Sequence, residues 1–384
     1  MNFESTFEKE CRRISQHKFL KKIKTYDDEV LPKMRKAGWI PKGFKERTIS
    51  FTSGTYTFER RFYVRNGEYC VPVDEHFGFE KGQRLSKELR NKIVKLALES
   101  TYRGVCRIIW ELYHVDISIW TVHQTVVQAE KLLKEREEYR YLDESSENKK
   151  LLVDYLYIEG DGVRFRTLHD KGEKKQTDYA HFIVHTGTKE KYKGRASCLN
   201  RKEFFGVDLQ TVRAQVIDYI HNCIELKENA VVITNSDGGV GYNPRSFRFI
   251  AKEIGAPIHE HFIDRYHVKE KVIKETQNHP KIGQLILDAI HAYDKGKLQV
   301  ALDTMEATLA LSEPNELFEE FKRYLMGNFK WMKPPQMRGL KGRGIGIIES
   351  NHRKITYRAK RRGMTWSKQN MEAMGQLIIL RDSG

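Results

Sequence analysis

Apolar and polar positions along the first 80 residues predict a small module that contains a helix and a β-hairpin. Residues 1–50 carry mixed charge and have helical potential in their first part. Residues 48–73 then alternate between apolar and polar side chains, which is typical of strands, and Ser53 with Gly54 marks the expected hairpin turn. We therefore expect residues 1–80 to form a small, strand-rich N-terminal module.

Three helices are predicted between residues 85 and 140, where apolar positions recur at helical spacing. Ser86 is a candidate N-cap of the first helix, and a short link at residues 114–118 separates the second from the third. Three helices with a tight link before the third are the outline of a helix-turn-helix, whose last helix enters the DNA major groove. Its polar face offers four candidates for DNA contact: Thr121, His123, Gln124 and Gln128. An ordinary three-helix bundle has the same periodicity, so both interpretations stay open.

A charged, polar stretch at residues 135–150 is typical of a linker, and a buried strand is predicted directly after it. Seven of the first eight residues of the segment 151–163 are apolar, which fits a strand buried on both faces that ends at Glu159-Gly160-Asp161-Gly162. Further strands are expected at 179–186, 203–207, 230–234 and 257–263, with helices at 209–224 and 244–254. Strands that first form a meander and then alternate with helices predict an α/β domain with a mixed sheet covered on both faces.

A helical block is expected to interrupt this domain. Residues 269–330 show apolar positions at helical spacing almost throughout, which predicts an all-helical insertion. A basic loop with several glycines follows, and then a helix at residues 347–362 with Glu349 in its first turn. We therefore expect the α/β domain to consist of residues 150–268 and 331–384, with the insertion between the two parts.

The charge of the chain indicates its class of partner. The net charge of +16, from 68 basic and 52 acidic residues, favours a polyanion, of which nucleic acid is the first candidate. Five scattered cysteines form no CxxC pair, so neither a zinc site nor a disulfide framework is indicated. No run of about 18 apolar residues occurs, and the N-terminus lacks the hydrophobic region of a signal peptide. We expect a cytoplasmic protein with reduced cysteines and no membrane segment.

Three carboxylates are the candidate chemical groups. Asp161 is expected after one core strand and Asp237 after another, and the ends of neighbouring strands in an α/β sheet bring such side chains together. The glycines that flank Asp161 are expected to leave room for a ligand or a metal ion. With Glu349 as a third oxygen ligand, the set suits Mg²⁺ or Mn²⁺ rather than zinc. Each acid alone also has an ordinary interpretation, as a turn aspartate or a glutamate that favours the helix dipole.

Basic residues after Glu349 are expected to lie along DNA. Residues 338–362 contain nine Lys or Arg and one acid, and a lone carboxylate in such a segment weakens phosphate binding unless it holds a cation. The candidates for phosphate contact are Arg353, Lys354, Arg358, Lys360, Arg361 and Arg362. Three further residues are expected to support the metal ligands or to contact DNA: Asp264, His267 and Asn351. The alternatives are a solvated basic face for the helix and a satisfied strand-end pair for Asp264 and His267.

The sequence resembles bacterial insertion-sequence transposases of the DDE class, specifically those of the ISLre type. The motifs that carry the resemblance are YIEGDGV (157–163), ITNSDGG (233–239), HFIDRYHV (261–268) and GIIESNHRKITYRAKRRGMTW (346–366), supported by LESTYRGVCRII (98–109). The resemblance implies an RNase H-like fold with a helical insertion before the catalytic glutamate. It also implies that the three catalytic acids are Asp161, Asp237 and Glu349, separated by 76 and 112 residues.

The function implied by this resemblance is metal-dependent DNA transposition. Such an enzyme cuts at the ends of its own element and joins the 3′-OH to target DNA, so its partners are double-stranded terminal repeats and target DNA. A homodimer or higher oligomer on DNA, within the bacterial cytoplasm and nucleoid, is expected with it. Three alternatives stay open: a non-enzymatic helix-turn-helix regulator, a decayed or C-terminally truncated transposase copy, and an RNase H-like nuclease that does not join strands.

Overall fold

The computed structural model describes residues 3–144, 150–169, 172–192, 195–309, 316–340, 346–360 and 364–383. The chain divides into two units, Met1–Leu133 and Lys134–Gly384.

The N-terminal unit begins with a long helix and a small antiparallel sheet. Its elements are α1 (Phe3–Lys36), β1 (Ile40–Phe51), β2 (Gly54–Arg65), β3 (Glu68–Cys70) and α2 (Pro72–His76). Phe51 pairs with Gly54, so the hairpin turn lies at Thr52 and Ser53, one position earlier than predicted. β1 also begins eight residues earlier than the alternating pattern indicated. Its first part contains Pro41 and a register shift, and poor strand formers of this kind hide a strand from a sequence pattern.

Three helices follow, as the sequence predicted: α3 (Lys87–Glu99), α4 (Tyr102–Tyr113) and α5 (Ile119–Glu144), of which α5 continues past the end of this unit at Leu133. Ser86 is confirmed as the N-cap of α3, because its Oγ accepts a hydrogen bond from the Leu89 N–H at 3.2 Å. Between α4 and α5 the link occupies the five predicted positions, and its first residue, His114, is in the left-handed region with φ of 50°. The helices pack through fully buried side chains: Leu89, Ile93, Val105, Ile109, Val122 and Val126.

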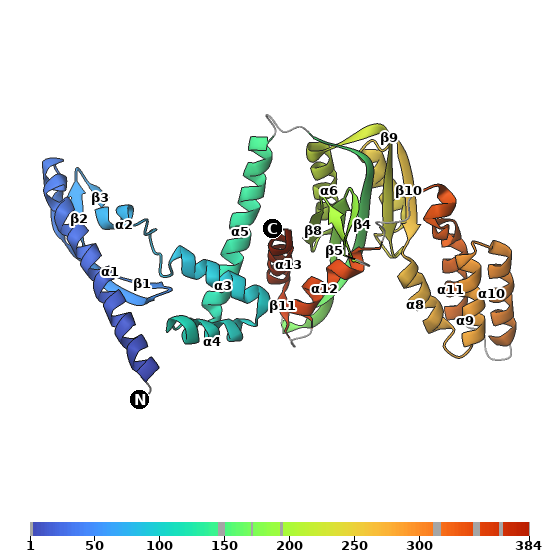
Figure 1. The fold of residues 1–384 in the computed structure, drawn as a ribbon, viewed down its shortest axis with the longest axis horizontal. Helices are drawn as coiled ribbons and strands as arrows, with labels where there is room; N and C mark the ends of the chain where they lie inside the picture. Colours follow the sequence, from blue (N-terminus) through green and yellow to red (C-terminus); the bar gives the residue numbers. More distant parts are fainter. Residues whose placement is uncertain are drawn as a thin grey trace. The chain divides into compact units, whose positions relative to one another are not determined.

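The second unit is built on a mixed sheet (Figure 1), and a mixed α/β fold is therefore confirmed. Its elements up to the helical block are β4 (Leu151–Leu168), β5 (Lys174–His185), β6 (Gly187–Tyr192), β7 (Arg195–Leu199), β8 (Lys202–Gly206), α6 (Leu209–Cys223), β9 (Ile224–Ser236), α7 (Pro244–Glu253) and β10 (Ile258–Ile263). The strand order is β10-β9-β4-β5-β8, and β11 (Trp366–Ser367) adds a short parallel pairing to β4. β5 pairs antiparallel with β4 and β8, whereas β9 is parallel to β4 and β10. The β6–β7 hairpin was not predicted.

One expectation about β4 is wrong. The strand does not end at Glu159–Gly162 but continues to Leu168, so Asp161 lies within the strand. The cause is pairing: β5 is hydrogen-bonded to β4 over its whole second half, with His181 opposite Asp161. Glycine and aspartate favour turns as isolated residues, but a neighbouring strand overrides that preference.

The two faces of the sheet differ in polarity. α6 and α7 cover one face, and α12 (Ile348–Ala359) with α13 (Lys368–Ser383) covers the other. The first face is apolar and includes Leu156, Ile158, Phe182, Val184 and Val232, packed against Val216 of α6 and Phe247 of α7. The second face carries buried polar side chains, namely Glu159, Asp161, His181, His185 and Glu203. Because side chains alternate along a strand, these polar residues of β4 and β5 point to the same face of the sheet, beneath α12.

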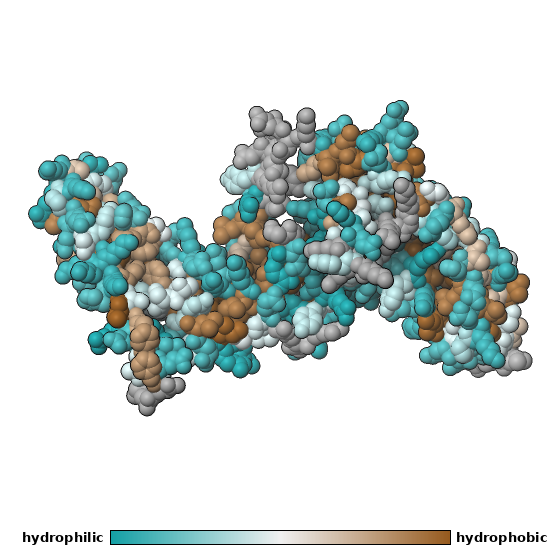
Figure 2. Space-filling view, in the orientation of Figure 1, coloured by the Kyte–Doolittle hydropathy of each residue, from teal (hydrophilic) through white to brown (hydrophobic). Residues whose placement is uncertain are grey.

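Four helices form a separate helical block between β10 and the end of the unit: α8 (Arg265–Glu275), α9 (Pro280–His291), α10 (Lys295–Leu309) and α11 (Glu316–Asn328). They agree with the helical pattern of the sequence and share one core, centred on Ile286, Leu302, Phe321 and Leu325. Two short 3₁₀ helices, η2 (Phe329–Met332) and η3 (Pro335–Arg338), lead from this block toward α12. The outer face of the block is partly apolar (Figure 2), and single exposed apolar residues such as Leu285 and Val300 are ordinary on protein surfaces.

A buried histidine in β10 makes the stability of the second unit depend on pH. Burial, together with the charges of His259, Arg338 and Arg248, lowers the pKa of His261 from its usual 6.5 to about 3. Below pH 6.5 the unfolded chain therefore binds a proton that the folded chain does not, so stability falls as the pH drops toward 3. We expect this loss to be about 1.4 kcal/mol per pH unit in urea unfolding.

The variant His261→Gln tests this pH dependence, since it keeps a polar side chain and removes the proton uptake. We expect a correspondingly flatter loss of stability between pH 6 and pH 4. The exposed His291 of α9 supplies the matched control, His291→Gln, whose profile is expected to follow that of the unaltered protein. A His261→Gln profile as steep as the original would contradict the assignment.

Candidate metal centre

Neighbouring parallel strands bring Asp161 and Asp237 together. In the pairing of β4 with β9, Glu159 lies opposite Asn235, and each aspartate follows two residues later in the same direction. Adjacent strands are about 4.8 Å apart, and Asp237 comes near enough to Asp161 for its negative charge to raise the pKa of the Asp161 carboxyl. Asp237 directly follows the last residue of β9, as the sequence predicted. Asp161 is buried, with 7% of its surface exposed.

The glycines around Asp161 are needed for packing and do not leave open space. A Cβ on Gly160 would lie 2.5 Å from the Phe182 ring, and a Cβ on Gly162 would lie 2.7 Å from the Asp178 carboxylate. Neither approach is sterically allowed for another residue type. The expectation that these glycines leave room for a ligand is therefore wrong, because β5 side chains fill that space.

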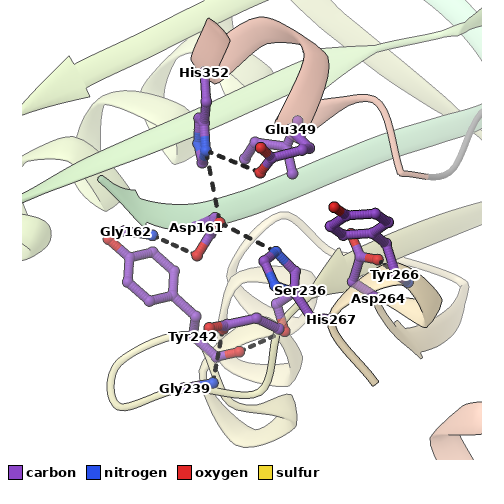
Figure 3. A network of polar contacts seen from close by, with 12 residues as sticks. Asp161, Gly162, Ser236, Gly239, Tyr242, Asp264, Tyr266, His267, Glu349 and His352 are labelled. Carbon is purple, nitrogen blue, oxygen red and sulfur yellow. Dashed lines mark hydrogen bonds and ion pairs between the residues drawn. The ribbon is translucent and has the colours of Figure 1, made fainter. Parts of the chain in front are cut away.

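Helix α12 contributes Glu349 and a residue that the sequence analysis missed, His352. The His352 ring is buried, and its Nδ1 lies 3.7 Å from Asp161 Oδ2 and 3.8 Å from Glu349 Oε2 (Figure 3). Two atoms that bind the same ion at about 2.1–2.2 Å are separated by roughly 3–4 Å. His352 lies three residues after Glu349 and therefore on the same side of the helix, a spacing that a search for metal ligands in the sequence would have found.

The electrostatics of this cluster favour a bound cation. Burial raises the pKa of Asp161 to about 7, and the negative charges of Asp237 and Glu349 add to this rise. Burial also lowers the pKa of His352 to about 2, so its imidazole is neutral and keeps a lone pair for a metal ion. Carboxylates held close together without a cation repel each other, and a divalent ion would remove that penalty.

The donor set fits a divalent metal ion. Ligand atoms of Asp161, Glu349 and His352 all lie within 4.8 Å of one another. A fourth group is near, because His267 Nε2 lies 3.9 Å from Asp161 Oδ2 and has no hydrogen-bond partner among the described residues. The sequence predicted three oxygen ligands. In the structure the carboxylates of Asp161 and Glu349 and the imidazole of His352 lie closest together, with Asp237 near them.

The other two supporting candidates have local partners. Asp264 is the N-cap of α8, and its Oδ1 accepts a hydrogen bond from the Tyr266 N–H at 2.7 Å. Asn351 is buried on α12, where its Nδ2 donates to the Ile347 carbonyl at 2.9 Å and its Oδ1 accepts from Arg201 at 3.2 Å. Both residues hold elements in place near the cluster, and His267 alone among the three faces Asp161.

The basic run on α12 does not lie on a single exposed face. Arg353 and Lys360 are exposed. Lys354 instead donates to the buried Glu203 carboxylate at 2.6 Å, and the Arg358 guanidinium is buried 5.3 Å from the centre of the Trp366 ring. The expectation that Lys354 and Arg358 face DNA is therefore wrong for this structure, because their charges are turned into the protein. The two remaining candidates, Arg361 and Arg362, lie outside the described residues.

The four candidates for groove contact lie on α5. Gln128 is exposed, whereas the other three are half-buried. Thr121 Oγ1 is 2.9 Å from Ser118 Oγ, and the His123 ring stacks on Trp120 with 5.1 Å between centroids. Gln124 Nε2 lies 3.3 Å from His123 Nδ1. Their role in DNA binding stays a prediction.

Within the described ranges no helix is long and apolar enough to cross a membrane.

Comparisons with known proteins give a family and a few relatives. A family model described as Uncharacterised protein family (UPF0236) matches residues 2–384. A UPF0236 protein in vanSb 3'region of Streptococcus gallolyticus is 28% identical over 366 residues, which cover 94% of this chain and 78% of the relative. A UPF0236 protein of Caldanaerobacter subterraneus subsp. tengcongensis is 24% identical over 359 residues, covering 92% and 71%. A solved structure, the Drosophila P element transposase strand transfer complex, aligns over 80% of this chain and 82% of that chain, with 11% identity and a TM-score of 0.24.

Proposed function

The chain belongs to the uncharacterised protein family UPF0236, and from its candidate metal centre we propose that it is a DDE-class transposase. In this proposal it cuts DNA at the ends of an insertion sequence and joins the freed 3′-OH to target DNA. The observation that carries the proposal is the meeting of the buried Asp161 on β4 with Glu349 on α12, beside Asp237. Carboxylates drawn from three separate elements into one cluster are costly for folding, and this cost indicates a chemical role.

The fold supports the RNase H-like part of the proposal. β4, β5 and β8 form an antiparallel meander, and β9 and β10 then extend the sheet in parallel on the other side of β4. The helical block α8–α11 follows, and the helix with Glu349 comes after it. This is the order that the resemblance to DDE transposases implies.

The residues of the cluster have assignable roles in the proposed reaction. Divalent ions in such a site activate a water or a 3′-hydroxyl and stabilise the leaving oxygen of a phosphodiester. Asp161, Asp237 and Glu349 would hold Mg²⁺ or Mn²⁺, and the imidazole of His352 favours Mn²⁺, because nitrogen ligands suit Mn²⁺ better than Mg²⁺. Asp161 has a pKa of about 7, so it must lose a proton to bind a cation, and binding strengthens as the pH rises through this value.

The proposed partner is double-stranded DNA, as terminal repeats and as target, bound by a homodimer or a higher oligomer. The net charge of +16 supports a polyanionic partner. Arg353 on α12 and Lys360, the residue directly after this helix, are exposed and could contact phosphates, although the Lys360 Nζ also lies 5.4 Å from the centre of the Phe165 ring. The three helices α3–α5 support a second DNA contact of the helix-turn-helix type.

Single alanine variants on α12 test the phosphate contacts. We expect Arg353→Ala and Lys360→Ala each to lower the slope of log affinity against log salt by about one unit, because each removes one phosphate contact. The slope is measured by fluorescence anisotropy on duplex DNA. Lys252→Ala, an exposed lysine on α7, is the matched control and should leave the slope as it is. An unchanged slope in both α12 variants would remove this helix from the DNA interface.

One assay separates the proposed transposase from its alternatives. The full chain is incubated with Mn²⁺ and duplexes that carry the two flanks of its gene. A transposase cuts at the element ends and also yields joined products. Cutting without joining would favour an RNase H-like nuclease, and binding without cutting would favour a helix-turn-helix regulator or a decayed copy.

A further inference from the structure

A second buried carboxylate lies next to the metal centre on the same strand. Glu159 is two residues before Asp161 on β4 and faces the same side of the sheet. Only 1% of its surface is exposed. Its Oε2 accepts hydrogen bonds from the Ile347 N–H at 2.9 Å and the Ile348 N–H at 3.1 Å, and both oxygens lie 3.1 Å from the Gly346 nitrogen. Three consecutive backbone N–H groups therefore converge on this carboxylate.

These N–H groups belong to the start of α12, which has no cap from its own residues. Ile347 is the N-cap residue, and its apolar side chain accepts no hydrogen bond. The first N–H groups of a helix lack partners within the helix, and the positive end of the helix dipole favours a carboxylate. Gly346 turns the chain into the helix with φ of 85°, a conformation that glycine adopts at little cost. Glu159 thus caps α12 from a distant strand.

Attachment of α12 to the sheet does not require a buried carboxylate. Burial raises the pKa of the Glu159 carboxyl above its usual value, while His185 and the N–H groups of α12 oppose that rise. His185 Nε2 is 3.8 Å from Glu159 Oε1. An apolar pair of similar volume would attach a helix to a sheet with less desolvation. What the carboxylate adds is direction, because its hydrogen bonds fix where the first turn of α12 begins.

The start of α12 matters because Glu349 is the next residue after the three that Glu159 binds. His352 follows one turn later, and its Nδ1 lies 3.7 Å from Asp161 Oδ2. β4 therefore supplies one proposed metal ligand, Asp161. Two residues earlier it supplies Glu159, the hydrogen-bond acceptor that fixes the helix with the other two proposed ligands. We propose that Glu159 is a positioning residue, which holds the first turn of α12 so that Glu349 and His352 face Asp161. This inference rests on the proposed metal-dependent function.

The variant Glu159→Gln tests the positioning role in the full chain. Glutamine has nearly the same size and its oxygen can take the place of Oε2, but its NH₂ group in the place of Oε1 cannot accept from the Gly346 N–H, and the side chain has no charge to favour the positive end of the helix dipole. We expect Mn²⁺ to bind about 10–100-fold more weakly, as is typical when a residue that orients metal ligands is changed. The affinity is measured by calorimetry, with Mn²⁺ alone as the probe. We also expect the amides of Ile347 and Ile348 to exchange hydrogen faster than in the unaltered protein.

A matched control separates positioning from general loss of stability. Thr101→Ala removes the cap of α4, whose Gly104 N–H donates to Thr101 Oγ1 at 3.1 Å. We expect this variant to melt at a lower temperature and to bind Mn²⁺ with unchanged affinity. Should Glu159→Gln not fold, the same comparison is made with Glu159→Asp, whose shorter carboxylate is expected to weaken Mn²⁺ binding about tenfold.

The outcomes distinguish this inference from the proposed function. Mn²⁺ affinity within twofold of the unaltered protein in a folded Glu159 variant would overturn the positioning role and leave the transposase proposal standing. Failure of the unaltered protein to bind Mn²⁺ would overturn the metal-dependent function itself, and the positioning role with it.

Discussion

If the proposed transposase function holds, Asp161→Asn is expected to lower the rate of DNA cleavage by about 1000-fold or more and to leave DNA affinity within about twofold. Metal-assisted stabilisation of a phosphodiester transition state amounts to several kcal/mol, and each 1.36 kcal/mol corresponds to a factor of ten in rate. Asparagine keeps the shape of the side chain but removes the charge that would hold the cation. Affinity for DNA comes from Lys and Arg elsewhere, so binding survives. Cleavage is measured under single-turnover conditions in Mn²⁺, and binding by anisotropy.

Asp154→Asn is the matched control for this result, since Asp154 lies on the same strand and is largely exposed beside Lys227. We expect it to cut DNA at the original rate. The thermal stability of Asp161→Asn should equal or exceed that of the unaltered protein at pH 7 and above. The raised pKa of Asp161 means that ionising this group costs the folded state free energy, which asparagine does not incur. Loss of both DNA binding and thermal stability would indicate misfolding and would contradict the assignment of Asp161 as a metal ligand.

Lys354→Met is expected to lower the free energy of unfolding by roughly 3 kcal/mol, because it leaves part of a buried ionic network without its cation. Glu203 is fully buried and is bound by Lys354 at 2.6 Å, by His181 at 3.1 Å and by Arg201 at 3.1 Å. Burial would raise the pKa of Glu203, but the hydrogen bond and charge of His181 and the charge of Lys354 outweigh it and lower the pKa. Unfolding in urea measures the loss.

The same helix offers the control for this variant. Lys360→Met removes an exposed charge from the end of α12, and we expect it to change stability by less than about 0.5 kcal/mol. The slope of log DNA affinity against log salt should show the reverse pattern. It should fall for Lys360→Met and stay constant for Lys354→Met. A Lys354→Met protein of full stability with a reduced salt slope would show that Lys354 contacts DNA after all.

Local patterns in the sequence were sufficient where one element decides the outcome. Ser86 caps α3, and the link before α5 falls at the predicted residues, because caps and helix periodicity depend on neighbours in the chain. Asp237 directly follows the last residue of β9, as the sequence predicted, and two glycines come after it. Asp161 was expected to follow the end of a strand because its neighbours are glycines, and only the pairing with β5 keeps it in a strand.

The residues that were missed or misread depend on contacts between distant parts of the chain. The role of Glu159 can be recognised only when α12 is packed on the sheet. The role of Lys354 can be recognised only when Glu203 lies beneath it. Part of this was within reach of the sequence. Ile348, His352 and Ile355 recur at spacings of four and three, which predicts that His352 belongs to the buried side of α12.

The contact between Glu159 and α12 also sets an order of events during synthesis. The carboxylate and the Ile348 N–H are 189 residues apart in the chain. At about 5–20 residues per second, a ribosome makes the second partner roughly 10–40 s after the first. The helices α3–α5 precede β4, so they leave the ribosome before either partner of this contact. A nascent chain therefore carries its three-helix region well before its candidate metal centre is complete, and the proposed cleavage of DNA must wait until α12 has emerged and docked.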